Sequence, residues 1–153
     1  GFASRSFAYP NSRRSDQTDR LLQTRFDRFR TGIGVSDRLT NTNDLPAEIF
    51  ATEQQVRSRR LLYGVSIDIG ARGKSRIVDP AVLLAAVKRA AKENLTVVFY
   101  AHAIADNHPQ IFTSLEMLEH ILGYAQDLGV SCLGFDDLPL VVATGSTDMP
   151  AVG

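Results

Sequence analysis

An aspartate and a histidine stand at the ends of two apolar segments that are suited to be neighbouring strands. His102 follows the most continuous apolar stretch, predicted as a strand over Thr96–Ala101, and Asp68 lies near the end of a second predicted strand, Leu61–Ile69. Side chains at the carboxyl ends of parallel strands meet at one edge of the sheet. If the two side chains pair, the carboxylate favours the imidazolium form, and the histidine can act as a general acid. A purely structural hydrogen bond at a strand end is the alternative.

A metal site is a second chemistry that the histidines allow. His102, Asp106 and His108 lie within seven residues of one another, and imidazole and carboxylate suit zinc, although a single loop supplies an incomplete ligand set. His108 precedes Pro109 and is expected in a solvated turn, and His120, on a predicted helix, is expected at the surface. A small metal hydrolase that uses the first three side chains stays open as a weaker alternative.

Two further motifs have simpler explanations. Gly70–Ser75 follows an apolar strand and looks like a phosphate-binding loop, but the spacing of that motif requires a glycine where this chain has Asp68. The motif also needs a helix at its lysine, whereas Asp79–Pro80 predicts that the next helix begins later. The adjacent carboxylates Asp136–Asp137 lie on a predicted turn, point in different directions and are expected to cap a short helix. The sequence therefore disfavours nucleotide binding.

The elements that must position these side chains alternate between strand and helix. Ser6–Tyr9 is a short apolar stretch closed by Pro10, and apolar residues at helical spacing predict a helix over Asp16–Phe29. Thr31–Gly34 is expected to be a short strand or turn. A polar loop without periodicity follows at residues 37–46.

The second half of the chain has stronger helix signals. Asp79–Pro80 places a capping residue and a first-turn proline before a helix. The apolar face of that helix is predicted to be Val82, Leu83, Ala86, Val87 and Ala90. Thr113–Glu116 has the spacing of a capping box, and the helix behind it is expected to stop at Gly129. Val130–Phe135 is predicted to be the next strand, so the alternation indicates an α/β protein with parallel strands.

Length and composition restrict the function classes. The 153 residues suit a single domain, assigned to residues 1–143, with a tail at 144–153. Lys plus Arg equals Asp plus Glu at 17 each, so the basic footprint of a nucleic-acid binder is absent. The apolar runs are strand-sized, too short to span a membrane, and Cys132 alone allows neither an internal disulfide nor a cysteine-cluster zinc site. Because the chain starts at Gly1 without a signal-peptide layout, a mature or cut product is expected.

Three segments share the order and spacing of a known domain. Its middle part corresponds to Ser6–Asn11, an amphipathic helix and Phe29–Gly32. Its late leucine/histidine motif corresponds to Val98–His102, and its closing helix and strand correspond to residues 113–138. Together, over about residues 5–138, they resemble the polysaccharide deacetylases (carbohydrate esterase family four, the NodB-like domain).

The resemblance implies a deformed (β/α) barrel that removes acetyl groups from N-acetylated amino-sugar polymers with the help of a divalent, zinc-like metal. It implies that His102 protonates the leaving amine and that Asp68 orients it. It also implies that Tyr9, Pro10 and Asn11 form a loop whose backbone amide faces the oxyanion. In the family, an early Asp-Asp pair supplies the base and one metal ligand, and a following histidine pair supplies the other ligands.

The chain departs from the family pattern in ways that change the expectation. Ala8 stands where many members have arginine, and Asn11 where an aromatic residue is common. The early Asp-Asp and His-x3-His motifs have no counterpart, so the chain itself does not offer the metal ligand set of that family. We therefore expect the C-terminal portion of a deacetylase, resembling the second half of the barrel. A non-catalytic fragment of the same scaffold, binding a glycan or a protein, is the alternative.

The resemblance also implies partners and a compartment. A glycan is the implied substrate, and no nucleic acid or membrane span is expected. A half barrel exposes strand edges and apolar faces that favour association, so a missing N-terminal half or a second copy is expected as a partner. The resemblance favours a periplasmic or secreted location.

Overall fold

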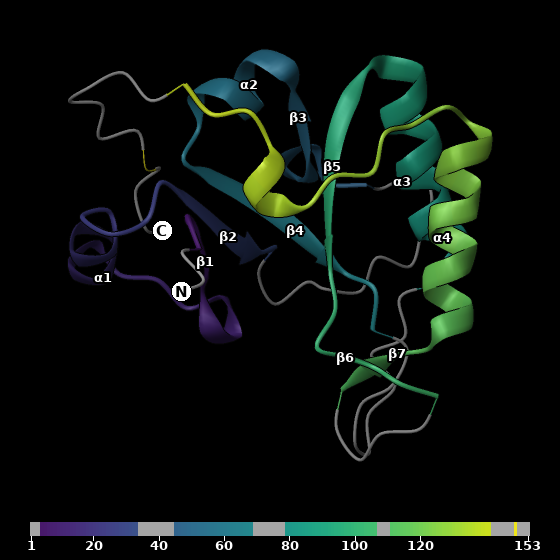
Figure 1. Cartoon of the computed structure of the whole chain (residues 1–153), viewed down its shortest axis with the longest axis horizontal. Coiled ribbons are helices and arrows are strands. Elements are labelled where there is room, and N and C mark those ends of the chain that lie inside the picture. Colours follow the sequence, from purple (N-terminus) through teal and green to yellow (C-terminus); the bar gives the residue numbers. More distant parts are fainter. Residues whose placement is uncertain (1–3, 34–44, 69–78, 107–110, 142–148, 150–153) are drawn as a thin grey trace.

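The core of the protein is one five-stranded sheet with helices on its faces (Figure 1). The computed structural model describes residues 4–33, 45–68, 79–106, 111–141 and 149. The strands lie in the order β1-β2-β4-β5-β3. Their bounds are β1 (Ser6–Ala8), β2 (Arg28–Gly32), β3 (Phe50–Thr52), β4 (Leu61–Ser66) and β5 (Leu95–Tyr100).

Within the described ranges, the other elements include four helices and three single 3₁₀ turns. The helices are α1 (Asp16–Leu22), α2 (Glu53–Ser58), α3 (Pro80–Glu93) and α4 (Leu115–Asp127). The 3₁₀ turns are η1 (Pro10–Ser12), η2 (Ala47–Ile49) and η3 (Phe135–Asp137), and a small parallel ladder joins β6 (Ala103–Ile104) to β7 (Phe112–Thr113). In Figure 1, α3 and α4 lie together beside β5, while the segment that holds η3 crosses the sheet near β4 and β5.

The prediction of a mostly parallel α/β protein is confirmed. β1, β2, β4 and β5 are parallel, and each pairs with the next in chain order. β3 alone is antiparallel, pairing with β5 at the edge of the sheet. The carboxyl ends of the four parallel strands therefore lie along one edge, where the candidate residues follow them.

Helix α3 forms as its sequence predicts. The Asp79 side chain accepts a hydrogen bond from the Ala81 N–H, and Pro80 occupies the first helical position. The buried residues of α3 are the predicted apolar face, Val82, Leu83, Ala86, Val87 and Ala90. They pack against the sheet in a cluster that also contains Val65 and Ile121, so burial of this face anchors α3 beneath β4 and β5.

The predicted helix over Asp16–Phe29 is wrong in its second half. Helix α1 ends at Leu22, and Phe29 lies in the middle of β2 with 0% of its surface exposed. The buried Arg60 guanidinium donates hydrogen bonds to the carbonyls of Gln23, Phe26 and Asp27, which stabilises the chain reversal that ends the helix. Leu22 and Phe26 still pack on the same cluster as Phe29. The apolar residues therefore share one cluster and have helical spacing in the sequence, although they belong to a helix, a strand and the segment between them.

The strand predicted over Val130–Phe135 is also wrong. No strand occurs in this stretch: residues 130–134 lack regular structure and η3 begins at Phe135. Phe135 and Leu138 instead pack against the opposite face of the sheet beside Leu62. Gly129 does adopt a left-handed φ of 69° after α4, as its predicted role at the helix end requires.

The cap of α4 lies one residue later than predicted. Ser114, not Thr113, accepts the hydrogen bond from the Met117 N–H. Thr113 belongs to β7, where its carbonyl accepts from the Ala105 N–H, so the ladder holds Thr113 and the next residue becomes the cap.

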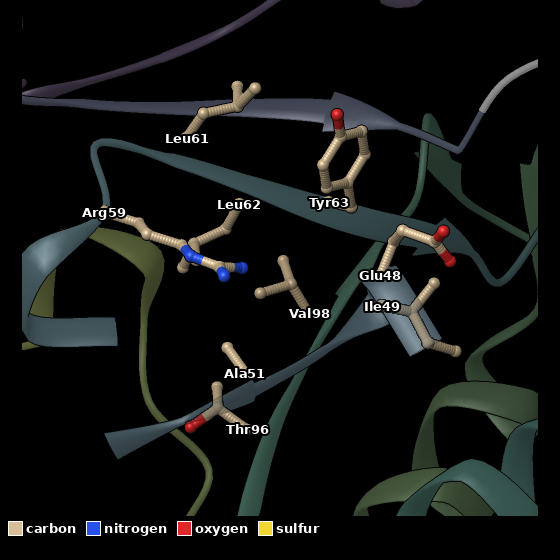
Figure 2. Close-up of a pocket in the computed structure, with 9 residues that line it drawn as sticks. All are labelled: Glu48, Ile49, Ala51, Arg59, Leu61, Leu62, Tyr63, Thr96 and Val98. Atoms are coloured by element: carbon tan, nitrogen blue, oxygen red, sulfur yellow. The ribbon is translucent and has the colours of Figure 1, made fainter. Parts of the chain in front are cut away.

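A continuous apolar strand is typical of a sheet covered on both faces, yet all six residues of β5 are only half-buried. A cavity of about 430 Å³ runs along β5 between α4 and the segment from Val130 to Leu138. A second cavity, of about 10 Å³, lies among η2, β3, β4 and β5 (Figure 2), with the Arg59 side chain reaching toward Val98. It has room for about one water molecule and no larger ligand.

Some predictions concern residues outside those described. The loop Gly70–Ser75, His108 and the boundary at residue 143 belong to this group. In the predicted tail, Met149 is described and packs against the cluster of Tyr9, Phe29 and Leu61. Among the helices that the structure describes, none combines the length and apolar character needed to cross a membrane.

Candidate functional site

Asp68 and His102 form a hydrogen-bonded pair at the carboxyl edge of the sheet. The distance between His102 Nδ1 and Asp68 Oδ2 is 2.8 Å, and the His102 backbone N–H donates to Asp68 Oδ1 at 3.0 Å. Ser66, the last residue of β4, donates its hydroxyl to Oδ2. Asp68 is held in place by three donors, so its carboxylate is a rigid acceptor for the imidazole.

Strand geometry explains why these residues meet. Side chains two residues apart in an extended chain share a face, so Asp68 follows the direction of Ser66 and His102 that of Tyr100. Ser66 and Tyr100 are partners in the β4–β5 ladder. The Ile67 N–H donates to the Tyr100 carbonyl at 2.9 Å, which continues the pairing one step beyond β4.

The Asp68–His102 pair, here called the dyad, combines a buried carboxylate with an accessible imidazole ring. The Asp68 side chain is 3% exposed and the His102 side chain 57% exposed. A carboxylate only accepts hydrogen bonds, so Nδ1 of His102 carries the proton that faces Asp68. Nε2 is then the ring nitrogen available for proton transfer to an external group, an arrangement suited to general acid–base catalysis.

The residues predicted to form the oxyanion loop after β1 have two different roles. The Tyr9 side chain is buried, and its hydroxyl donates to Asp19 Oδ1 at 2.6 Å in the core beneath α1. Burial, followed by the hydrogen bond with Asp19, raises the pKa of the Tyr9 phenol. Tyr9 thus anchors the loop, while Pro10 and Asn11 are exposed at the sheet edge.

The turn Asn11–Ser12 has an unusual backbone. Asn11 has a φ of 52° and Ser12 a φ of 56°, so two consecutive non-glycine residues are left-handed. Such conformations cost roughly 1–3 kcal/mol each unless the surroundings hold them. Here the Ser12 Oγ accepts from the Gly32 N–H at 2.8 Å, and the Thr31 hydroxyl donates to the Ser12 carbonyl. β2 therefore holds this turn at the edge of the sheet.

Tyr100 connects the turn with the dyad. A Cβ atom built on Gly32 would lie 2.6 Å from the Ser12 Oγ and 2.9 Å from the Tyr100 hydroxyl oxygen, so both groups crowd the same glycine. The Tyr100 and His102 rings are in edge contact, with centroids 6.0 Å apart. The structure therefore brings His102, Asp68 and the turn after Pro10 to one region of the sheet edge through Tyr100.

We expect Gly32→Ala to destabilise the protein by about 1–3 kcal/mol, because the new methyl group must displace Ser12 or Tyr100. Gly123→Ala is the matched control. Gly123 lies in α4 with no atom within 4 Å of a built Cβ, so the same change there should stabilise by about 0.5–1 kcal/mol. Urea unfolding of both variants checks the prediction, and equal effects of either sign would contradict the proposed crowding at Gly32.

Sequence reasoning missed Ser12, Ser66 and Tyr100 as neighbours of the site. Ser66 and Tyr100 stand two residues before Asp68 and His102. The period of two in a strand places them on the same face as the dyad, so strand periodicity was the signal that could have found them. Nothing in the local sequence indicates Ser12, because its position depends on the left-handed turn.

The remaining candidate residues are exposed, lie in η3 or fall outside the description. Asp106 and His120 are exposed, and His108 is not among the described residues. Within the described ranges, no three His, Cys, Asp or Glu side chains group closely enough to hold a metal ion. Asp136 and Asp137 lie within η3, where the predicted cap role is not seen, and Asp136 accepts a hydrogen bond from Ser4.

The candidate site therefore consists of the Asp68–His102 dyad, Tyr100 beside it, and the Pro10–Ser12 turn next along the same edge. Comparisons of the chain with protein-family models, curated proteins and solved structures found no match.

Proposed function

We propose that the chain is the C-terminal part of a polysaccharide deacetylase, in which the Asp68–His102 dyad protonates the leaving amine of an N-acetylated amino sugar. The observation that carries the proposal is the dyad itself, an exposed imidazole whose Nδ1 is held 2.8 Å from a buried carboxylate. The sequence resemblance adds the substrate class.

The proposed chemistry uses the chain's own atoms. His102 in its protonated form presents Nε2–H to the nitrogen of the scissile amide, while Asp68 stabilises the imidazolium and keeps the ring oriented. The tetrahedral intermediate forms when water, deprotonated by a base from outside this chain, adds to the amide carbonyl. Proton transfer from His102 to the nitrogen then allows the C–N bond to break, which releases the sugar as an amine and the acetyl group as acetate. The exposed backbone of Asn11, in its left-handed turn, is the group proposed to face the oxyanion.

The arrangement of strands supports the proposal at the level of the fold. Consecutive parallel strands that pair in chain order are the pattern of a (β/α) barrel, and β1, β2, β4 and β5 follow it. We infer that this sheet corresponds to the second half of such a barrel, with the dyad at its carboxyl-terminal face. In barrels of this type that face holds the active site.

The metal implied by the resemblance does not fit the described residues. Their His, Cys, Asp and Glu side chains form no group of three that could ligate an ion, and the family's early Asp-Asp and His-x3-His motifs are not in the sequence. No step of the proposal therefore runs through a metal. We propose that any ligands and the base come from a missing N-terminal half or another chain, with the acid supplied here.

An assay of acetate release from N-acetylglucosamine oligomers tests this function. It uses the gene product that contains these 153 residues, supplied with Zn²⁺. We expect equal amounts of acetate and free amine. Binding of the oligomer without acetate release, by a protein that also binds zinc stoichiometrically, would contradict the proposed reaction.

A non-catalytic binding module is the second candidate, favoured by the lack of a three-ligand group in the described part of the chain. The acetate-release assay separates the two, because a binding module takes up the oligomer without releasing acetate. Zinc titration of the 153-residue chain by calorimetry tests the metal-hydrolase alternative. Under either proposal, with ligands supplied elsewhere, we expect no tight stoichiometric binding. Tight binding that His108→Ala abolishes would instead support the small metal hydrolase using His102, Asp106 and His108.

A further inference from the structure

An arginine lies on the sheet face next to the dyad. Arg30, in the middle of β2, places its guanidinium carbon 3.9 Å from the centroid of the Tyr100 ring. Tyr100 in turn contacts the His102 ring. Arg30 and His102 therefore both contact the Tyr100 side chain.

Two glycines make the floor beneath Arg30 and Tyr100, with Gly64 under both side chains and Gly32 under the Tyr100 hydroxyl. Gly32 and Gly64 are register partners in β2 and β4. A Cβ built on Gly64 would lie 3.0 Å from both Arg30 Cδ and Tyr100 Cδ1, so the arginine stem and the tyrosine ring lie directly over bare backbone. Because neither glycine has a positive φ, close approach of these side chains, rather than backbone conformation, explains why glycine suits both positions.

Arg30 differs from the other shielded arginines in what its guanidinium contacts. Arg28 and Arg60 donate to backbone carbonyls, and Arg14 pairs with Asp19 at 2.6 Å. Among the described residues, no carboxylate forms an ion pair with Arg30. Its guanidinium instead contacts the Tyr100 side chain. Burial lowers the pKa of Arg30, and the Tyr100 side chain partly opposes that effect.

A half-buried cation that has no carboxylate partner among the described residues is an unusual use of an arginine. Removing a guanidinium from water is costly unless an anion or several acceptors compensate. The planar fork of the guanidinium matches a carboxylate with two parallel hydrogen bonds, and its stacking on an aromatic ring leaves the edge free for that pairing. The floor of glycines, the ring and the guanidinium together form a place where an oxyanion would be stabilised.

We propose that Arg30 binds a carboxylate of the substrate, so that the site takes an acidic glycan, one in which a carboxylate-bearing sugar or substituent accompanies the N-acetylated sugar. The identification as a glycan rests on the proposed function, whereas oxyanion binding at Arg30 rests on the geometry alone. Arg30 is a binding residue that determines specificity, and the proton transfer stays with His102.

Titration of the ¹⁵N-labelled 153-residue chain with glucuronate, followed by NMR, tests the proposal. We expect the backbone amides of Gly32, Gly64 and Tyr100 to shift with glucuronate and not with neutral N-acetylglucosamine at equal concentration. Arg30→Gln should weaken glucuronate binding by about 10- to 100-fold. Arg30→Lys keeps the charge but loses the planar fork, so its affinity for glucuronate should lie between those of the wild type and Arg30→Gln.

Arg25→Gln is the matched control, because Arg25 is exposed and lies before β2, outside the strands that carry Arg30, Gly32 and Gly64. It should bind glucuronate as the wild type does. Equal binding by Arg30→Gln with an unchanged amide spectrum elsewhere would overturn the proposal, as would equal shifts with the neutral sugar. Inorganic phosphate that binds the same amides more tightly than glucuronate would replace the acidic sugar by a phosphate ligand.

The titration measures binding without turnover, so its result is separable from the proposed reaction. Glucuronate binding that depends on Arg30, together with an inactive gene product, would leave the oxyanion site standing and remove the deacetylase proposal. Acetate release that depends on His102, together with no effect of Arg30→Gln on glucuronate binding, would do the reverse.

Discussion

His102→Ala is expected to lower the turnover of the gene product by about 10²- to 10⁴-fold, the contribution usual for a positioned general acid. Its effect on stability should be small. The His102 side chain is 57% exposed, and Asp68 Oδ1 keeps its hydrogen bond from the backbone N–H of residue 102, which the substitution does not remove. The measurement is the initial rate of acetate release, with urea unfolding of the same variant.

Two further variants sharpen the test of His102. His120→Ala removes an exposed imidazole on α4 and should leave turnover unchanged. Asp68→Asn should lower turnover while keeping the backbone contact, because the asparagine amide would donate toward Nδ1 and select the other ring tautomer. Wild-type turnover in His102→Ala would refute the acid role, and equal losses in His120→Ala would mark the effect as nonspecific.

Phe29→Ala should produce the largest loss of stability among the single substitutions considered for this protein, about 3–5 kcal/mol. Phe29 is 0% exposed and packs with Tyr9 and Leu61, with the Phe29 and Tyr9 ring centroids 5.8 Å apart. Its removal leaves a cavity between β2 and α1 that rigid strands cannot close. Urea unfolding monitored by circular dichroism measures the change.

Leu21→Ala is the control for Phe29→Ala. The helical pattern of the sequence places both residues on one buried face, whereas the structure buries Phe29 and exposes Leu21. Leu21 and Phe29 belong to one apolar series in the predicted helix over Asp16–Phe29, yet Leu21 is 66% exposed. We therefore expect Leu21→Ala to change stability by about 0.5 kcal/mol or less. Comparable losses in both variants would contradict the exposure of Leu21 on α1.

These cases show which parts of the fold the sequence could predict. Helix α3 was predictable because its signals are local: Asp79 and Pro80 begin it, and its apolar face repeats with the helical period. The parallel α/β class was predictable for the same reason, since alternating periods indicate alternating elements. The end of α1 was not predictable, because Arg60 lies far along the chain from the carbonyls it satisfies.

The candidate site divides in the same way. Strand ends identified Asp68 and His102, because side chains that follow parallel strands must lie at one edge of the sheet. The identity of the neighbours required coordinates. The register that sets Gly32 against Gly64, the left-handed turn at Asn11, and the stacking of Arg30 on Tyr100 depend on how separate strands align.

The sequence by itself determined the class of fold, the helix α3 and the two strand ends from which Asp68 and His102 project, because local periodicity and capping act over a few residues. Only the tertiary structure decided that His102 Nδ1 faces the Asp68 carboxylate and that the Tyr9 side chain is buried in the core. It alone also placed Arg30 over the bare backbone of Gly64. These features are set by strand register and by contacts between distant residues, and no local pattern encodes them.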